Sequence, residues 1–155
     1  MNADLLLVDG PPSLDDYLAL RAAAGLSPKT REQGTMGLRG SWTALHVRHE
    51  PSDQTVGMGR VVGDGGWYFH VVDMAVRPSF QRQGIGDAIL THMLAEISQG
   101  APADAYISLL ADAPGSPLYS RHGFVETAPG SVECGCRRRG MRSKLEGSAS
   151  RRGAE

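Results

Sequence analysis

A glycine-containing turn, Gln-Arg-Gln-Gly-Ile-Gly-Asp at residues 81–87, could bind an anion. The segment before it, residues 68–76, is aromatic and β-branched, which is typical of a strand. After it, apolar residues recur at steps of three and four over residues 85–97, which predicts an amphipathic helix. Gly84 and Gly86 lack Cβ atoms where this helix begins, so a ligand can approach N–H groups at the positive end of the helix dipole. The turn therefore predicts a phosphate site.

Two other phosphate-binding motifs do not match this spacing. A P-loop needs Lys and then Ser or Thr directly after its last Gly, whereas Asp87 follows Gly86. A dinucleotide fingerprint needs Gly or Ala three residues after its second Gly, where this chain has Ile89. Its first Gly should also end the strand, but Gly84 lies eight residues past Val76.

Two motifs together resemble one known family. The pattern Gln-x-x-Gly-x-Gly at residues 81–86 resembles the Gln/Arg-x-x-Gly-x-Gly/Ala signature of the GCN5-related N-acetyltransferases (GNAT). Leu-Tyr-Ser-Arg-His-Gly-Phe at residues 118–124 resembles that family's Leu-Tyr-x-x-x-Gly-Phe segment. The resemblance covers roughly residues 3–142 and is strongest over 67–125. It implies an α/β fold with a mixed, mostly antiparallel central sheet and helices on both faces.

The resemblance also implies acetyl-CoA as a cosubstrate and a set of residues that bind it. The backbone at the end of the strand would pair with the pantetheine arm, and the N–H groups of the turn would bind the pyrophosphate, with the Arg82 guanidinium adding charge. Where many members have an Asn that bonds the arm, this chain has Asp112, which cannot donate when ionised, so Ser116 or water is an alternative. The predicted cofactor-binding residues are Met74, Ala75, Val76, Gln81, Arg82, Gln83, Gly84, Ile85, Gly86 and Asp87.

Acetyl transfer to an amine needs an acid for the departing thiolate and a base for the amine proton. The resemblance assigns the acid to Tyr119, whose alternative role is to anchor a short helix on the sheet. For the base, His70 stands where the histone-modifying branch of the family has a catalytic Glu, and imidazole titrates near neutral pH. Asp73 is the rival, although a carboxylate in an apolar strand could equally serve a structural hydrogen-bonding role.

Strand alternation bears on these two candidates for the base. It puts His70 on one face of the strand with Met74 and Val76, and Asp73 on the other with Ala75, unless a bulge shifts the register. We therefore expect at most one of His70 and Asp73 to face the acceptor.

The expected partners are acetyl-CoA and an amine acceptor, a small molecule in preference to a protein, and a homodimer is allowed. In the family the acceptor lies near the first two helices and the last strands, which corresponds here to Tyr17, Arg21, Trp67, Glu126 and Glu133. With 16 basic and 17 acidic residues, the composition favours neither nucleic acid nor an anionic membrane as a partner. An alternative function is a non-catalytic acyl-CoA-binding sensor or assembly module, against which the presence of Tyr119 argues.

The elements that must position these residues follow from the rest of the sequence. Ser13 is expected to cap a helix that has Asp16 at its third position and ends near Ala24, and Ser27-Pro28 to open a second helix toward Met36. A third helix follows the turn, and a short fourth contains Tyr119. The predicted strands are residues 4–8, 42–48, 55–62, 68–76, 106–110, 124–127 and 134–141.

We predict one N-acetyltransferase domain over residues 1–142 and a disordered tail over residues 143–155, which is rich in Ser, Gly, Ala and charge. Cys134 and Cys136 are the only cysteines, and two thiols cannot complete a structural zinc site, so we predict reduced thiols without a role and no metal. No apolar run approaches a membrane span and no basic region precedes residues 5–8, so a cytoplasmic location is expected.

Overall fold

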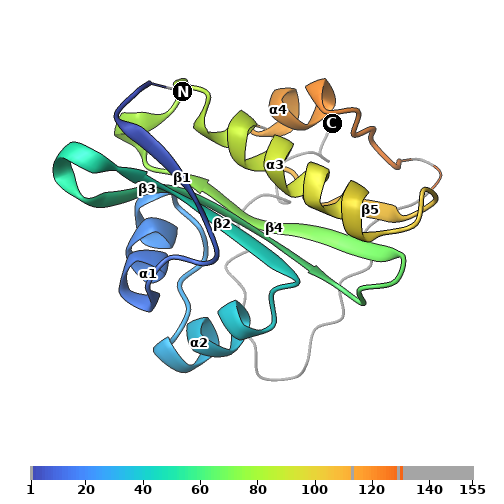
Figure 1. Cartoon of the computed structure of the whole chain (residues 1–155), viewed down its shortest axis with the longest axis horizontal. Coiled ribbons are helices and arrows are strands. Elements are labelled where there is room, and N and C mark those ends of the chain that lie inside the picture. The colour runs from blue at the N-terminus through green and yellow to red at the C-terminus, as the bar shows by residue number, and fades with distance from the viewer. Residues whose placement is uncertain (1, 113, 129, 131–155) are drawn as a thin grey trace, which may run out of the picture. The chain divides into compact units, whose positions relative to one another are not determined.

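A five-stranded sheet with helices on both faces makes up most of the described part of the chain, residues 2–112, 114–128 and 130 of a computed structural model (Figure 1). The strands lie in chain order and every neighbouring pair is antiparallel except β4 and β5, which are parallel. This arrangement confirms the predicted mixed, mostly antiparallel sheet. The strands are β1 (Leu5–Asp9), β2 (Thr43–His49), β3 (Gln54–Gly63), β4 (Tyr68–Val76) and β5 (Tyr106–Leu109).

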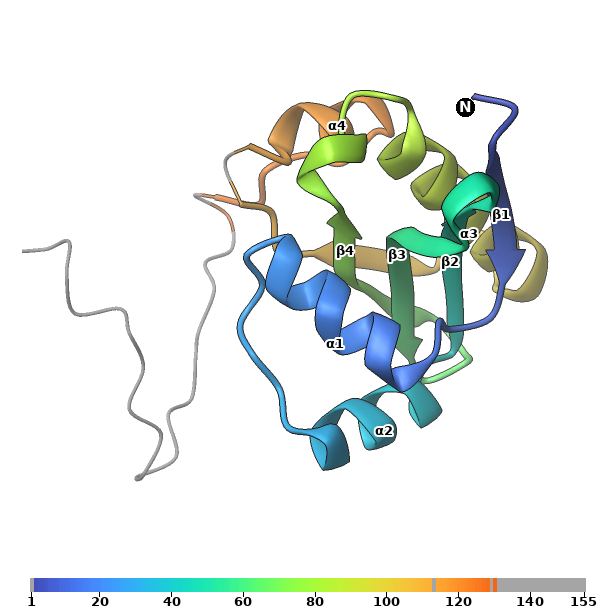
Figure 2. The ribbon, with the colours of Figure 1, turned by 90° about the vertical axis from the view of Figure 1, so that its left-hand side faces the viewer.

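The helices divide between the two faces of the sheet. Figures 1 and 2 show α3 (Ile85–Gly100) and α4 (Ser116–Arg121) on one face, and α1 (Leu14–Ala23) and α2 (Arg31–Arg39) on the other. Single 3₁₀ turns, Glu50–Ser52 and Pro78–Phe80, follow β2 and β4. In the part of the chain that the structure describes, none of the helices combines the length and apolar character needed to cross a bilayer.

Each face of the sheet has its own apolar core. Under α3, the buried residues come from the central strands and the inner face of the helix; they include Leu45, Val47, Val56, Val61, Phe69, Val71, Ile85, Ile89, Leu90, Met93 and Ile97. Under α1, a smaller cluster contains Tyr17, Leu20, Met58 and Ala75. Strands buried on both faces in this way give the sheet a rigid centre, and β4 contributes to both clusters.

The starts of α1 and α2 test two predicted N-terminal caps. The Ser13 side chain accepts a hydrogen bond from the Asp16 backbone N–H at 3.1 Å, so the predicted cap of α1 is confirmed. The predicted start of the second helix after Ser27-Pro28 is wrong. Instead Thr30 and Gln33 form a reciprocal capping box, which satisfies two backbone N–H groups at once and starts α2 at Arg31.

The predicted strands before residue 111 agree with the structure to within a residue or two at each end. Residues 124–127, in contrast, do not form the predicted strand; Phe124 packs instead against the core under α3. Residues 1–125 group into one compact unit and residues 126–155 into another, so the predicted domain end at residue 142 stays a prediction. The predicted strand 134–141, both cysteines and the tail 143–155 lie outside the described residues.

A β-bulge in β4 changes which side chains share a face. Ala75 pairs with Met58 and Val72 pairs with Arg60, so Gly59 of β3 lies opposite both Asp73 and Met74. The extra residue is accommodated at Asp73, whose φ is +55°, a left-handed conformation that is uncommon for a non-glycine residue.

The bulge turns Asp73 onto the α1 side, where its carboxylate meets α1, and Met74 onto the α3 side, where it packs on the core. This bulge is the exception that the sequence analysis allows to simple alternation: His70 and Asp73 share one face with Ala75, while Met74 and Val76 lie on the other.

Candidate active site

The turn before α3 has the backbone geometry that an anion site needs. Gly84 is the N-cap of α3 with φ +79°, and no side chain among the described residues caps the helix there. Arg82, two residues earlier, also has a left-handed φ of +60°, a conformation that costs energy for a residue with a Cβ and that clusters at functional sites. The first helical hydrogen bond runs from Ala88 N–H to Gly84 O at 2.9 Å. The N–H groups of residues 85–87 precede it and are available to a ligand.

A Cβ at Gly86 would meet a side chain of another helix. A Cβ built on it would lie 3.3 Å from Cδ2 of Leu118 in α4, so the bare backbone allows α4 to approach the first turn of α3. A second contact comes from the residue that ends α4: His122 Nε2 lies 2.9 Å from Asp87 Oδ1. The Asp87 carboxylate is thus engaged by α4. These two contacts dock α4, which contains Tyr119, onto the helix end that would bind the phosphates.

The edge of β4 beside this helix end is only partly paired. The parallel pairing with β5 runs from Tyr68 opposite Tyr106 to Val71 opposite Leu109, whereas β4 continues to Val76. Within the described residues, the last five positions of β4 have no strand neighbour on the β5 side. Gln81 donates through Nε2 to the Val76 carbonyl at 3.3 Å, which ties the turn to the end of this strand. An extended ligand can add to such an edge through backbone hydrogen bonds.

Tyr119 is half-buried against the core under α3, and its ring makes an edge contact with Phe124 at a centroid distance of 6.2 Å. Burial, together with the negative charge of Asp112, raises the pKa of the Tyr119 phenol above its usual value. The phenol therefore keeps its proton at neutral pH and is available as a donor. The packing equally fits the alternative role of an anchor for α4.

His70 lies on the opposite face of the sheet from this core and contacts β5. Its Nδ1 is 2.8 Å from Ser108 Oγ, and Ser108 Oγ is 3.4 Å from both the Phe69 carbonyl oxygen and the Tyr68 hydroxyl. If the Ser108 hydroxyl donates to either oxygen, Nδ1 of His70 must be the donor to Ser108, which leaves the lone pair on Nε2. Partial burial lowers the pKa of His70 below 6.5, so the ring is neutral at pH 7.

Asp73 is surrounded by donors. The Tyr17 hydroxyl donates to Oδ2 at 2.7 Å, Arg60 donates to the same oxygen, and Arg21 pairs with Oδ1. Burial by itself would raise the pKa of this carboxyl, but the hydrogen bonds from Tyr17 and Arg60 and the charges of Arg60 and Arg21 outweigh it, and the pKa is lowered. A carboxylate so fully paired is a weak base.

The same network ties the sheet to α1 and α2. Beyond Asp73, Arg21 donates to the Ser27 carbonyl at 2.9 Å and Arg60 donates to the Gly37 carbonyl at 3.0 Å. Tyr17 and Arg21, which the family resemblance places near the acceptor, belong to this network. The signal that could have revealed Arg60 is a charged residue inside the otherwise apolar strand β3.

The predicted site residues therefore fall into two groups. The turn residues 81–87 and Tyr119 lie on the α3 side, and His70 and Asp73 lie on the α1 side, with the partly paired edge of β4 between them. Of the other residues expected near an acceptor, Trp67 is exposed, and Glu126 belongs to the second unit. Glu133 is outside the described residues. Ser108, which orients His70, was missed because its role depends on the pairing of β4 with β5.

The chain is similar in sequence and in fold to known proteins of one family. The model of the acetyltransferase (GNAT) domain matches residues 31–145. The chain is 25% identical over 118 residues to GCN5-related N-acetyltransferase 1, chloroplastic, of Arabidopsis thaliana, a match that covers 76% of this chain and 59% of that protein. The chain thus spans less than two thirds of the length of this relative.

Two solved structures have the same fold. A protein of unknown function from meticillin-resistant Staphylococcus aureus, named a probable acetyltransferase, is 38% identical with a TM-score of 0.81, covering 86% of this chain and 99% of that one. A GNAT-family acetyltransferase from Streptococcus pneumoniae has a TM-score of 0.71 at 24% identity and covers 88% of this chain and 99% of that one. Since the family model matches most of the sequence, the chain belongs to the GNAT family of acetyltransferases.

Proposed function

We propose that this protein is an acetyl-CoA-dependent N-acetyltransferase that moves an acetyl group to a primary amine by direct attack in a ternary complex. The observation that carries the proposal is the left-handed turn at Arg82 and Gly84, which opens the uncapped end of α3 next to the partly paired edge of β4. A pyrophosphate fits the first feature and an extended pantetheine arm fits the second. GNAT membership independently implies acetyl-CoA.

This geometry supports two backbone segments as the ones that would hold acetyl-CoA. The backbone N–H groups of the turn residues Arg82–Asp87 would bind the pyrophosphate, and the β4 backbone at Met74–Val76 would pair with the arm. The bound thioester supplies an activated acetyl group. An N–H of the same β4 segment would stabilise the oxyanion that develops at its carbonyl.

Two side chains would move the protons. His70 takes the proton of the attacking amine, directly or through one water, because its ring is neutral at pH 7 and Ser108 orients it. As the new C–N bond forms and the C–S bond breaks, Tyr119 donates its phenol proton to the departing sulfur. Asp73 is disfavoured as the base because two guanidinium groups and a phenol already occupy its oxygens.

Substitution of Tyr119 tests the proposed acid. Tyr119→Phe should lower kcat by about a hundredfold or more, the usual effect of removing a general acid, and leave acetyl-CoA affinity nearly unchanged. The measurement is thiol release with acetyl-CoA and a panel of primary amines, together with calorimetry of acetyl-CoA binding. Tyr106→Phe, at an exposed tyrosine on β5, is the matched control and should retain wild-type turnover.

Two outcomes would contradict the proposal. Wild-type turnover in Tyr119→Phe, with chemistry rate-limiting, would leave Tyr119 as an anchor for α4. Tight acetyl-CoA binding without transfer to any amine would favour the alternative of a non-catalytic sensor or assembly module. The preference for a small-molecule acceptor, the homodimer and the cytoplasmic location stay predictions.

A further inference from the structure

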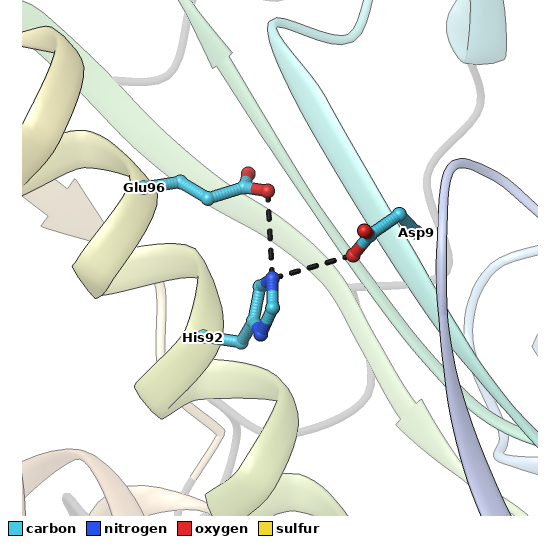
Figure 3. A group of neighbouring side chains, drawn as sticks. All are labelled: Asp9, His92 and Glu96. Carbon is cyan, nitrogen blue, oxygen red and sulfur yellow. Dashed lines mark ion pairs between the residues drawn. The ribbon is translucent and has the colours of Figure 1, made fainter.

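Three potential metal ligands lie close together between the middle of α3 and the end of β1, away from the residues that would bind acetyl-CoA. His92 and Glu96 are one helical turn apart on α3, and Asp9 is the last residue of β1 (Figure 3). Each offers one ligand atom, and the three atoms lie within 4.8 Å of one another. The sequence shows only the spacing of His92 and Glu96. Asp9 joins them only through the fold, so the group of three is not visible in the sequence.

The distances from His92 to the two carboxylates match the spacing of ligands around a common ion. His92 Nε2 lies 3.3 Å from Asp9 Oδ1 and 3.5 Å from Glu96 Oε1. Charge-assisted N–H···O bonds are typically about 2.7–2.9 Å long, so both contacts are long for that interaction. A tetrahedral ion with ligand bonds of about 2.0–2.1 Å places neighbouring ligand atoms about 3.3 Å apart. Small side-chain movements would bring all three atoms to one ion.

The backbone holds these ligands from two rigid elements. Asp9 pairs with Leu45 in the sheet, and the next residue, Gly10, donates to the Ala44 carbonyl at 2.8 Å, so the end of β1 is fixed on β2. His92 and Glu96 lie at i and i+4 on a sixteen-residue helix, and both side chains are partly exposed. Such positioning lowers the entropic cost of assembling a site, and the exposure gives an ion access from solvent.

We propose that Asp9, His92 and Glu96 bind a divalent transition-metal ion of the zinc type, with water completing the coordination. One imidazole nitrogen and two carboxylate oxygens suit Zn²⁺, Co²⁺ or Ni²⁺, whereas Mg²⁺ and Ca²⁺ prefer oxygen ligands alone. The two carboxylates give the group negative charge that the ion would neutralise. The bound ion would join the end of β1 to the middle of α3.

The proposed site is separate from the acetyl-transfer chemistry. His92 is eight residues and Glu96 twelve residues past Gly84, which at the helical rise corresponds to about 12 and 18 Å along the axis of α3. An ion there cannot reach the pyrophosphate site or the edge of β4 through these ligands. Its role is to stabilise the packing of α3 on the sheet, so the test does not depend on acetyl transfer.

Zinc binding to the full chain tests the proposal. Cys134 and Cys136 can also bind zinc, so the measurements use a chain with Cys134→Ser and Cys136→Ser. We expect calorimetry to show one zinc ion per chain with a micromolar dissociation constant. At a zinc concentration of about 100 times that constant, the Tm should rise by roughly 5 °C or more. Mg²⁺ and Ca²⁺ at the same concentration should leave Tm unchanged.

Variants then identify the ligands. His92→Gln, Asp9→Asn and Glu96→Gln should each weaken zinc binding by about tenfold or more. The matched controls are His49→Gln and Glu32→Gln, at sites outside the group, and both should bind zinc as the parent does. Absence of one-to-one zinc binding at 100 µM, unchanged affinity in any of the three ligand variants, or an equal Tm rise with Mg²⁺ would overturn the proposal. Circular dichroism confirms that each variant is folded.

Discussion

His70 and Asp73 show how environment separates two residues that sequence treats as equal candidates. Both lie on the α1 face of β4, but one is a neutral ring oriented by a single hydroxyl and the other is a carboxylate held by two arginines. A base needs a free lone pair and a pKa near the working pH. His70 is neutral at pH 7 because burial lowers its pKa, while Asp73 already accepts hydrogen bonds from three side chains and its pKa is lowered as well.

The pH dependence of the rate should therefore follow His70. As the pH falls through the pKa of His70, which burial lowers below 6.5, the ring becomes protonated and can no longer accept the amine proton. We expect kcat/KM for the amine to have an acidic limb below pH 6.5 that disappears in His70→Gln, along with most of the rate. An unchanged limb in folded His70→Gln would exclude His70 as the base.

Asp73 should matter for stability. Asp73→Asn leaves two guanidinium groups without their counter-charge in a mostly buried site, which should cost about 3 kcal/mol of the free energy of unfolding at pH 7. Asp15→Asn removes an exposed partner of Arg31 and is the matched control, for which we expect little change. Denaturant unfolding measures both.

The lowered pKa of Asp73 determines how its contribution to the free energy of unfolding changes with pH. A carboxyl group whose pKa is lower in the folded than in the unfolded state stabilises the fold above the unfolded value, about 3.8, and loses that contribution as the pH falls through the folded value. The stability gap between wild type and Asp73→Asn should be constant above pH 5 and shrink below pH 4. A gap that persists unchanged in acid would contradict the assigned role of the carboxylate charge.

The contact between α3 and α4 assigns separate roles to two glycines that the motif presents as one unit. Gly84 is favoured by its own backbone, because φ is +79°, whereas a Cβ at Gly86 would lie 3.3 Å from Leu118 Cδ2, so that the side chain of Leu118 must move to make room. From the sequence alone, both glycines are expected to leave space for a phosphate. His122 and Asp87 reinforce the same helix contact.

A rescue experiment distinguishes these two roles. Gly84→Val and Gly86→Val should each weaken acetyl-CoA binding by about tenfold or more, measured by calorimetry. Adding Leu118→Ala should recover most of the affinity of Gly86→Val, because the smaller side chain makes room for the branched Cβ. It should recover none for Gly84→Val. Failure of rescue at residue 86, in a folded protein, would restore the phosphate-clash interpretation.

Helices and strands with a strong residue pattern could be predicted from the sequence. Where two possible helix starts lie close together, or where a strand can contain a bulge, the sequence did not decide between the alternatives. The helix after the turn follows from apolar spacing and the strand at residues 68–76 from its aromatic and β-branched composition, and Ser13 marks its helix start correctly. The start of α2 was misplaced because a capping box at Thr30 provides more hydrogen bonds than Ser27-Pro28. The sequence left undecided whether a bulge occurs in β4. The bulge places Asp73 beside donors from α1 and β3 that only the fold brings together.

The two faces of the sheet serve different parts of the proposed reaction. The α3 side carries the turn, Tyr119 and the docked α4, while the α1 side carries His70 and the Asp73 network that holds α1 and α2. Each motif on the α3 side is a short continuous run of sequence, at residues 81–87 and 118–124, so both could be recognised from sequence. On the α1 side, Tyr17, Arg60 and Asp73 are far apart in the chain, so their association required the tertiary structure.

This division predicts a one-sided footprint for acetyl-CoA in hydrogen–deuterium exchange. Binding should slow exchange of the backbone amides at Met74–Val76 and Arg82–Asp87, which would pair with the arm and the pyrophosphate. Amides of α2, which lies on the other face, should exchange at the same rate with and without ligand. CoA lacking the acetyl group should give the same pattern, since the contacts are to the arm and the phosphates. Protection centred on α2, with none at the turn, would place the nucleotide on the wrong face and overturn the assignment of both cofactor segments.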